Sequence, residues 1–288
     1  MIHRYEHKGT RWYYSTKEIN GLPPYTLVPS VTTVLQATSP TPHGLLKWYA
    51  ELGWDGAQQR KREAADYGTC FHTLAEWMLQ TNCIDVENAL NFYLLQKHNK
   101  NLEYSVELLV RLEKDLAALA TFIDEKEVRV IYNEFPGIGD FKGNGWNKFY
   151  AGTTDLVCEM TFNRKRVVAL IDYKTGNVYP SAATQLAAYS DIVQQNTDYT
   201  IDMLFNWQPS DWTKDTPTYK LTNQTDDYWF EIYSWGYKLA EFELRYKQPT
   251  EHITYKSEIR PGADLAPIRT PIKEWLMVLS QEVQNANV

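Results

Sequence analysis

Two aspartates and a lysine are spaced so that they could act together on one substrate. Asp155 and Asp172 lie at equal distances from Asn163 and Arg164, the expected turn between two apolar runs. If these runs form a tight antiparallel hairpin, Asp155 lies directly opposite Asp172, with Cβ atoms roughly 4.5–5.5 Å apart on one face. Lys174 is two residues beyond Asp172, so strand alternation puts it on the same face. This prediction depends on the register, because a shift of one residue would turn a strand's side chains over.

The chemistry expected of this group is metal-assisted. Two carboxylates so close repel each other unless a positive charge lies between them. A hard divalent cation with oxygen ligands, such as Mg²⁺, meets that need. It would lower the pKa of a bound water and offset charge on a phosphate, while Lys174 would position the water or stabilise the phosphate. The alternative is a structural salt bridge, since an isolated Asp-x-Lys is common.

Two helices are expected to add side chains to this group. His72 and Glu76 are four residues apart, so both project from one helix face and could complete a metal shell. Gln185 and Tyr189 lie one turn apart on the helix expected after Lys174. The alternatives are a packed or surface histidine for His72, and an ordinary helix face for Gln185 and Tyr189.

Apolar periodicity predicts the elements that position these residues. Helices are expected at 44–53, 57–79, 85–97, 104–125, 180–196, 225–246 and, as a short one, 271–284. Strands are expected at 127–135, 153–160, 166–174 and 200–207. We expect a helix break at Asp66–Thr69, a glycine-rich loop at 136–148, and one or two short hairpins before residue 35. This order indicates one α/β or α+β domain over residues 1–288.

Composition excludes several other classes of protein. The chain has 288 residues, 43% of them hydrophobic, which is enough for a sizeable core. Its three cysteines form no CxxC pair, which argues against a disulfide framework or a zinc or iron–sulfur cage. A net charge of −7 counts against a module that only coats DNA, but not against a site that holds cations. With neither a signal peptide nor an apolar run of about 18 residues, the expectation is a cytoplasmic protein without membrane partners.

Four motifs in order resemble the RecB-like branch of the PD-(D/E)XK nuclease superfamily. They are Gly68-Thr69-x-x-His72-x-x-x-Glu76, Gly152-Thr153-Thr154-Asp155, Asp172-Tyr173-Lys174-Thr175-Gly176 and Gln185-x-x-x-Tyr189. The segment Pro29-Ser30-Val31-Thr32-Thr33-Val34-Leu35 is similar to the opening of phage-encoded and mitochondrial genome maintenance exonucleases of this branch. Each motif is weak alone, but four in this order are specific.

The resemblance implies a fold and a role for each motif residue. The fold is a central mixed β-sheet flanked by helices, with a restriction-endonuclease-like core at about 60–207, a helical insertion at about 81–127 and a C-terminal extension at about 208–288. The implied ligands of Mg²⁺ or Mn²⁺ are His72, Asp155, Asp172 and the Tyr173 carbonyl. The implied catalytic residues are Asp155, Asp172, Lys174, which serves the attacking water, and Glu76, the helix carboxylate. Gln185 and Tyr189 would bind substrate, and Glu134 occupies a position where relatives often carry an acid.

Three hypotheses of function follow. The first is a metal-dependent deoxyribonuclease, an exonuclease on linear DNA in phage or bacterial recombination, repair or replication. Its candidate partner is a single-strand-binding or annealing protein. If it is phage-encoded, its compartment is the host cytoplasm. The second is a non-catalytic nucleic-acid-binding protein, for which DNA binding without cleavage would be the evidence. The third is a phosphohydrolase of small molecules, which would act on nucleotides but not on polymers.

Overall fold

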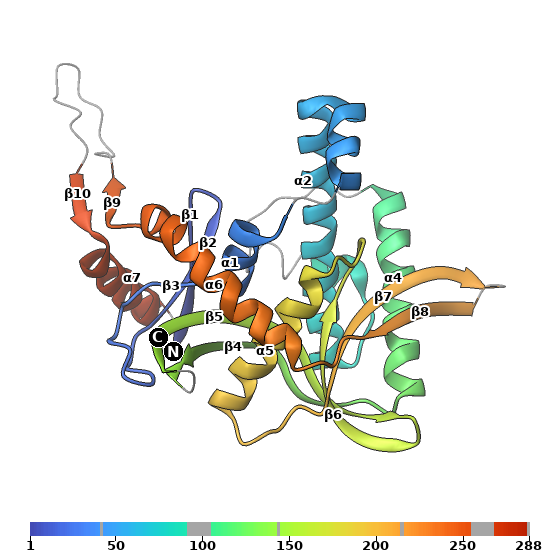
Figure 1. Ribbon diagram of the computed structural model, residues 1–288. Helices are drawn as coiled ribbons and strands as arrows, with labels where there is room; N and C mark the ends of the chain where they lie inside the picture. Colours follow the sequence, from blue (N-terminus) through green and yellow to red (C-terminus); the bar gives the residue numbers. More distant parts are fainter. Residues whose placement is uncertain (41–42, 91–104, 143–144, 214–215, 255–267, 287–288) are drawn as a thin grey trace. The chain divides into compact units, whose positions relative to one another are not determined.

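The computed structural model describes residues 1–40, 43–90, 105–142, 145–213, 216–254 and 268–286 (Figure 1). Contacts divide the chain into two compact units. Unit 1 comprises Met1–Thr38, Gly137–Gly152 and Ser234–Val288, and unit 2 comprises Ser39–Pro136 and Thr153–Tyr233. No helix in the described ranges has the length and apolar character needed to cross a membrane.

Unit 2 contains most of a five-stranded mixed sheet with the strand order β4-β5-β6-β7-β8, while the end of β4 and the start of β5 belong to unit 1. The strands are β4 (Arg129–Phe141), β5 (Trp146–Phe162), β6 (Lys165–Tyr173), β7 (Met203–Thr213) and β8 (Thr216–Asn223). β6 pairs in parallel with β7, while β5–β6 and β7–β8 are antiparallel. The helix α5 (Ser181–Asn196) provides the crossover between the parallel strands and contacts both. The prediction of a central mixed sheet flanked by helices is confirmed.

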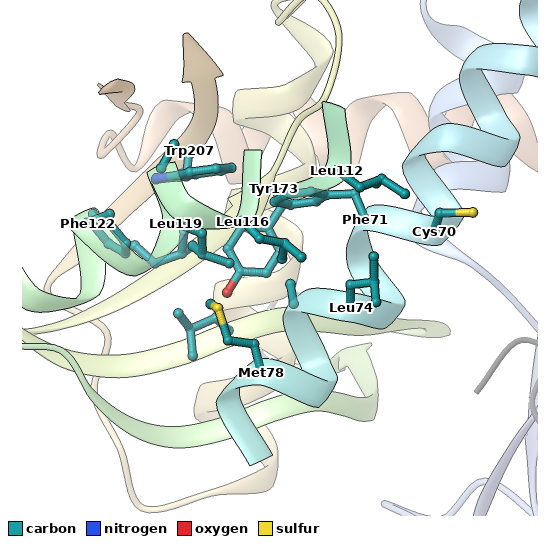
Figure 2. Close-up of a cluster of buried hydrophobic side chains, with 14 of the residues drawn as sticks. Cys70, Phe71, Leu74, Met78, Leu112, Leu116, Leu119, Phe122, Tyr173 and Trp207 are labelled. Atoms are coloured by element: carbon teal, nitrogen blue, oxygen red, sulfur yellow. The ribbon is translucent and has the colours of Figure 1, made fainter. Parts of the chain in front are cut away.

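Two helices cover one face of this sheet with an apolar layer. They are α2 (His43–Thr81) and α4 (Val106–Glu125), which pack against each other while α4 also contacts β7 and β8. Figure 2 shows where they meet the sheet, with labelled residues Cys70, Phe71, Leu74 and Met78 of α2, Leu112, Leu116, Leu119 and Phe122 of α4, and Tyr173 and Trp207 of β6 and β7. Their spacing of three and four along each helix is that of an amphipathic stripe. Because strand side chains alternate, Asp172 and Asn206 are directed to the opposite face.

Unit 1 contains the N-terminal strands and the C-terminal helices. The strands β1 (Ile2–His7), β2 (Thr10–Ser15) and β3 (Val28–Pro29) form an antiparallel sheet, followed by α1 (Val31–Thr38). The Ser30 hydroxyl accepts a hydrogen bond from the Thr33 N–H at 2.9 Å, which caps α1. The C-terminal part contains most of α6 (Tyr228–Lys247), then β9 (Glu251–Thr254), β10 (Ile268–Pro271) and α7 (Ile272–Ala286).

Several element boundaries differ from the sequence-based predictions. The loop expected at 136–148 is too long, because β4 continues to Phe141 and β5 begins at Trp146. Gly139 is required there by packing, since a Cβ on it would lie 2.9 Å from Cζ of Tyr150. The helix break expected at 66–69 is wrong, because α2 runs through these residues. Its interruption at Gly53, where φ is 70°, lies where the helix expected at 44–53 ends. The helix α1 and the strand β8 were not expected, and residues 91–97 of the helix expected at 85–97 lie outside the described residues.

Candidate active site

The hairpin between β5 and β6 has the register that the sequence predicts. Its turn residues Asn163 and Arg164 both have positive φ, 49° and 63°, as a two-residue type I′ turn requires. Pairing then runs from Phe162 opposite Lys165 to Leu156 opposite Ile171. One step further along the same register, Asp155 faces Asp172. The tight turn therefore brings the two carboxylates to one end of the hairpin.

Asp155 is held by two groups from different elements. It is buried, with 8% of its surface exposed. Its Oδ1 lies 3.2 Å from His72 Nδ1 on α2, and its Oδ2 accepts a hydrogen bond from the Tyr173 backbone N–H at 2.7 Å. These contacts fix the orientation of the carboxylate between the sheet and α2.

Asp172 has a different pair of partners. Its Oδ2 lies 2.6 Å from Lys174 Nζ and accepts a hydrogen bond from Asn206 Nδ2 on β7 at 2.9 Å. Asp172 is 2% exposed, and burial of a charge at this level is tolerated only when it is paired and hydrogen-bonded. The two aspartates therefore have separate roles in the local network, one beside the histidine and one beside the lysine.

The helix α5 continues the network from Lys174. Lys174 Nζ donates a hydrogen bond to Gln185 Oε1 at 3.1 Å, and Gln185 Nε2 donates to Tyr189 Oη at 3.0 Å. The two α5 residues are one turn apart and so act on the same side of the helix. This chain of contacts holds the ammonium group in place between Asp172 and α5.

The charges perturb one another's protonation. Burial lowers the pKa of His72, but Asp155 and then Glu134 and Asp172 outweigh it and raise that pKa to about 9. Burial alone would raise the pKa of Asp155, yet His72 and Lys174 hold it below its usual value. Burial raises the pKa of Asp172, and repulsion from Asp155 adds to it, although Lys174 partly offsets both. The two carboxylates are thus pushed in opposite directions, as is common at functional sites.

Burial lowers the pKa of Lys174 as well, but the carboxylates of Asp172 and Asp155 outweigh it and raise that pKa above its ordinary value. Lys174 is therefore a cation over the neutral range in the metal-free protein. An ammonium in that state donates hydrogen bonds and offsets negative charge.

A donor set for a cation lies beside this network. His72, Glu134 and Asp155 each offer one ligand atom, and these atoms lie within 4.8 Å of one another. One imidazole and two carboxylates form a chemically suitable set for Mg²⁺ or Mn²⁺. Glu134 has φ of 51°, a left-handed conformation that costs a non-glycine residue roughly 1–3 kcal/mol and that is found preferentially at functional sites.

Comparison with known proteins identifies the family. Residues 45–253 match the model of the PD-(D/E)XK nuclease superfamily. The chain belongs to this superfamily. Its five-stranded mixed sheet flanked by helices agrees with a restriction-endonuclease-like core, and membership makes the chain a hydrolytic nuclease whose substrate is nucleic acid. Nucleases of this superfamily generally use divalent metals, which the donor set of His72, Glu134 and Asp155 suits.

More distant likenesses are found among solved structures. A protein from Eubacterium rectale named "putative exonuclease" is 13% identical with a TM-score of 0.42, covering 64% of this chain and 67% of its own. The protein SSO0001 is 12% identical with a TM-score of 0.28, covering 62% of this chain and 75% of its own. No curated protein matches the sequence. Placement of this nuclease in the RecB-like branch stays a prediction.

Most of the predicted site residues of the nuclease are brought together in unit 2. The contacts above connect His72, Asp155, Asp172, Tyr173, Lys174, Gln185 and Tyr189. Glu76 is buried on α2, where its Oε1 accepts a hydrogen bond from Gln80 Nε2 at 3.3 Å, and it is not in the three-residue donor set. Asp172 is also outside that set. The catalytic role of Glu76 and the ligand role of Asp172 stay predictions.

Two amide residues of the network were not singled out from the sequence. Asn206 is fully buried and donates to Asp172, and its own Oδ1 accepts a hydrogen bond from Gln224 Nε2 at 3.1 Å. The available signal was a single amide inside the apolar run Met203–Trp207, because a buried polar side chain needs a partner. That signal does not identify the partner, so Asp172 could not have been predicted as the group that Asn206 binds.

Proposed function

We propose that this chain is a Mg²⁺- or Mn²⁺-dependent deoxyribonuclease that degrades linear DNA from its ends, in phage or bacterial recombination, repair or replication. We place it in the cytoplasm, that of the host if the protein is phage-encoded, working beside a single-strand-binding or annealing protein. The preference for ends rests on the similarity of Pro29–Leu35 and the later motifs to exonucleases of the RecB-like branch.

The observation that supports this proposal is that a set of possible metal ligands and a lysine ammonium lie together at one end of the β5–β6 hairpin. A donor set of His72, Glu134 and Asp155 lies beside an ammonium held by Asp172. Such an arrangement suits a reaction in which negative charge increases on a phosphate. Preorganised positive charge at that position is commonly the largest contribution to catalysis.

Each of these residues has a proposed role in phosphodiester hydrolysis. His72, Glu134 and Asp155 would hold the cation, with Asp172 and the Tyr173 carbonyl as further ligands by family resemblance. A cation bound there would lower the pKa of a bound water and would offset charge on the scissile phosphate. Lys174 donates hydrogen bonds to the attacking water or to a phosphate oxygen, and it is aligned for this by Asp172 and Gln185.

The decisive experiment uses end-labelled linear DNA and the same DNA as a closed circle. Each is incubated with protein and Mg²⁺, Mn²⁺ or EDTA. Asp172→Asn and Lys174→Ala are compared with the matched exposed substitutions Asp198→Asn and Lys220→Ala. We expect wild type and the two controls to degrade linear DNA with metal, and both site variants to lose at least about a hundredfold, the scale for removing a charge-stabilising group.

Different outcomes reject different parts of the proposal. Cleavage that persists in EDTA would exclude the metal-dependent mechanism. Circles digested as fast as linear DNA would exclude the exonuclease assignment alone, and RNA cleaved in preference to DNA would exclude only the substrate. DNA binding without cleavage under any metal would favour the non-catalytic alternative, and turnover of nucleotides but not polymer would favour a small-molecule phosphohydrolase.

A further inference from the structure

The helix α6 carries two apolar stripes on opposite sides. One stripe is buried and consists of Tyr237, Ala240 and Leu244, preceded by Tyr233. The other stripe is exposed, with Trp235 at 51%, Leu239 at 76%, Phe242 at 70% and Tyr246 at 78%. A helix that is apolar on two sides is normally covered on both. We therefore expect another molecule to cover the exposed stripe.

The buried side of α6 packs within unit 1. Tyr237 Oη donates a hydrogen bond to the Phe149 carbonyl at 2.9 Å, and its ring lies against Phe141 and Trp146, with centroids 5.2 and 5.3 Å away. The exposed side is not used in these contacts. Its four large side chains, with Phe242 and Tyr246 ring centroids 5.0 Å apart, therefore form a continuous surface available to another molecule.

The spacing of the exposed stripe is that of a helix-pairing seam. The intervals between Trp235, Leu239, Phe242 and Tyr246 are four, three and four residues, and Tyr228 and Ile232 continue the same pattern backwards. Alternation of three and four is the heptad rule for one helix lying along another. We propose that this stripe binds a second copy of this chain, with the two α6 helices antiparallel about a two-fold axis.

The pattern matches itself when one copy is reversed. Centring the axis level with Tyr237 places Trp235 opposite Leu239 of the second copy. The same register places Ile232 opposite Phe242 and Tyr228 opposite Tyr246. Every seam position thus faces another seam position, as an isologous contact requires.

Charges beside the seam fit the same arrangement. In this register Glu231 of one copy lies beside Arg245 of the other, twice per dimer. Lys238 approaches its own counterpart at the axis, but its Nζ is directed onto the Trp146 ring, 5.3 Å from the centroid. The helix has three acidic and three basic residues, so it lacks the positive excess that a nucleic-acid strand would favour. These observations favour a protein partner, and the self-match favours this chain.

The surface available is large enough for a modest dimer. Aromatic side chains bury about 150–250 Å² each when fully covered, and four exposed aromatics plus Leu239 on each copy would bury roughly 1,000 Å² in total. That is near the lower limit of specific interfaces. We therefore expect a dimer that dissociates on dilution.

Sedimentation velocity of the full chain at about 1–100 µM tests the proposal. Wild type is expected to shift from monomer to dimer over this range. Leu239→Asp, which would bury a carboxylate in the seam, is expected to weaken dimerisation by at least about a hundredfold. Val278→Asp on α7, an aliphatic position in the same unit that is 52% exposed, is the control and should dimerise like wild type. Circular dichroism melting verifies that both variants are folded.

A charge exchange distinguishes a second copy from any other partner. Glu231→Arg and Arg245→Glu should each weaken the dimer about tenfold, and the double variant should recover most of the loss, since like charges then face opposite ones again. A wild-type protein that is monomeric at all concentrations overturns the proposal, as does a Leu239→Asp variant that dimerises normally. Failure of the double variant to recover overturns the antiparallel register. Loss of DNA affinity in Leu239→Asp without any change in mass would assign the stripe to nucleic acid instead.

Discussion

The two faces of the sheet in unit 2 bury different kinds of side chain at neighbouring positions, apolar on one face and polar on the other. On the face covered by α2 and α4, the rings of Phe71 and Trp207 stack with centroids 5.5 Å apart and planes within 10°. On the other face, one residue along each strand, Asp172 and Asn206 are equally buried but form hydrogen bonds and an ion pair. The apolar face needs only close packing, whereas each group on the polar face depends on a specific partner.

The apolar face should therefore contribute mainly to the stability of the nuclease, and the polar face mainly to its activity. Substitutions on the apolar face should lower the free energy of unfolding and affect activity only through folding. Substitutions on the polar face should lower activity and change the free energy of unfolding little. The repulsion between Asp155 and Asp172 offsets much of the stability that their hydrogen bonds and ion pairs contribute. Five predictions separate the two faces.

The largest effect is expected on the apolar face. Phe71→Ala removes a fully buried ring in contact with Tyr173 and Trp207, and should lower the free energy of unfolding by about 3–5 kcal/mol. Urea unfolding measures this, with exposed Val110→Ala as the control. A loss no larger than that of the control would mean that this layer is not the core.

On the polar face, Asp172→Asn keeps the shape of the side chain and removes its charge. Nuclease activity should fall about a hundredfold because Lys174 loses its aligning carboxylate. The free energy of unfolding should change by less than about 1 kcal/mol, because relief of repulsion offsets the lost ion pair. Activity assays and urea unfolding on the same preparation give both numbers, and a stability loss like that of Phe71→Ala would contradict the division between the faces.

The ion pair between His72 and Asp155 gives the metal-free protein a pH dependence. The pKa of His72 rises from 6.5 to about 9 on folding, so its contribution to stability is complete below pH 6.5 and is lost as pH rises through 9. Because His72 is partly exposed, we expect this contribution to the free energy of unfolding to be only about 1–2 kcal/mol. Thermal melts in EDTA should show wild type above His72→Gln at pH 6 and converging with it near pH 9.5. A gap that widens with pH would contradict the sign.

Asn206 tests whether the buried amide aligns the site without touching substrate. Asn206→Leu fills the same space but cannot donate to Asp172, and we expect activity about tenfold lower with KM unchanged, as for other groups that orient a catalytic ligand. Gln224→Leu, one step further out, should have a smaller effect in the same direction. A change confined to KM would indicate substrate contact instead.

The smallest effect on activity is expected for Glu76→Gln. The Glu76 carboxylate accepts a hydrogen bond from Gln80, and it lies outside the donor set of His72, Glu134 and Asp155. Steady-state assays beside Asp172→Asn measure the difference. An equally large loss would place Glu76 in the catalytic set, as the motif resemblance predicts.

Local pattern was sufficient for several helices and for the β5–β6 hairpin. The helix expected at 104–125 begins at Val106 because the Ser105 hydroxyl accepts a hydrogen bond from the Leu108 N–H, and it ends at Glu125. The β5–β6 register followed from two turn residues and the symmetry of the flanking strands. These features depend on interactions between residues close in the chain, which periodicity reports directly.

Residue spacing was therefore enough to predict the family motifs, the facing of Asp155 and Asp172, and the position of Lys174 beside them. The packing of distant segments brings Glu134 to His72 and Asn206 to Asp172. The structure also places Gly137 and Gly139, which were expected in a loop, in the strand β4. Such outcomes depend on which distant segments pack together, and no residue spacing along the chain specifies the partner of a single buried amide or of a carboxylate in a strained backbone position.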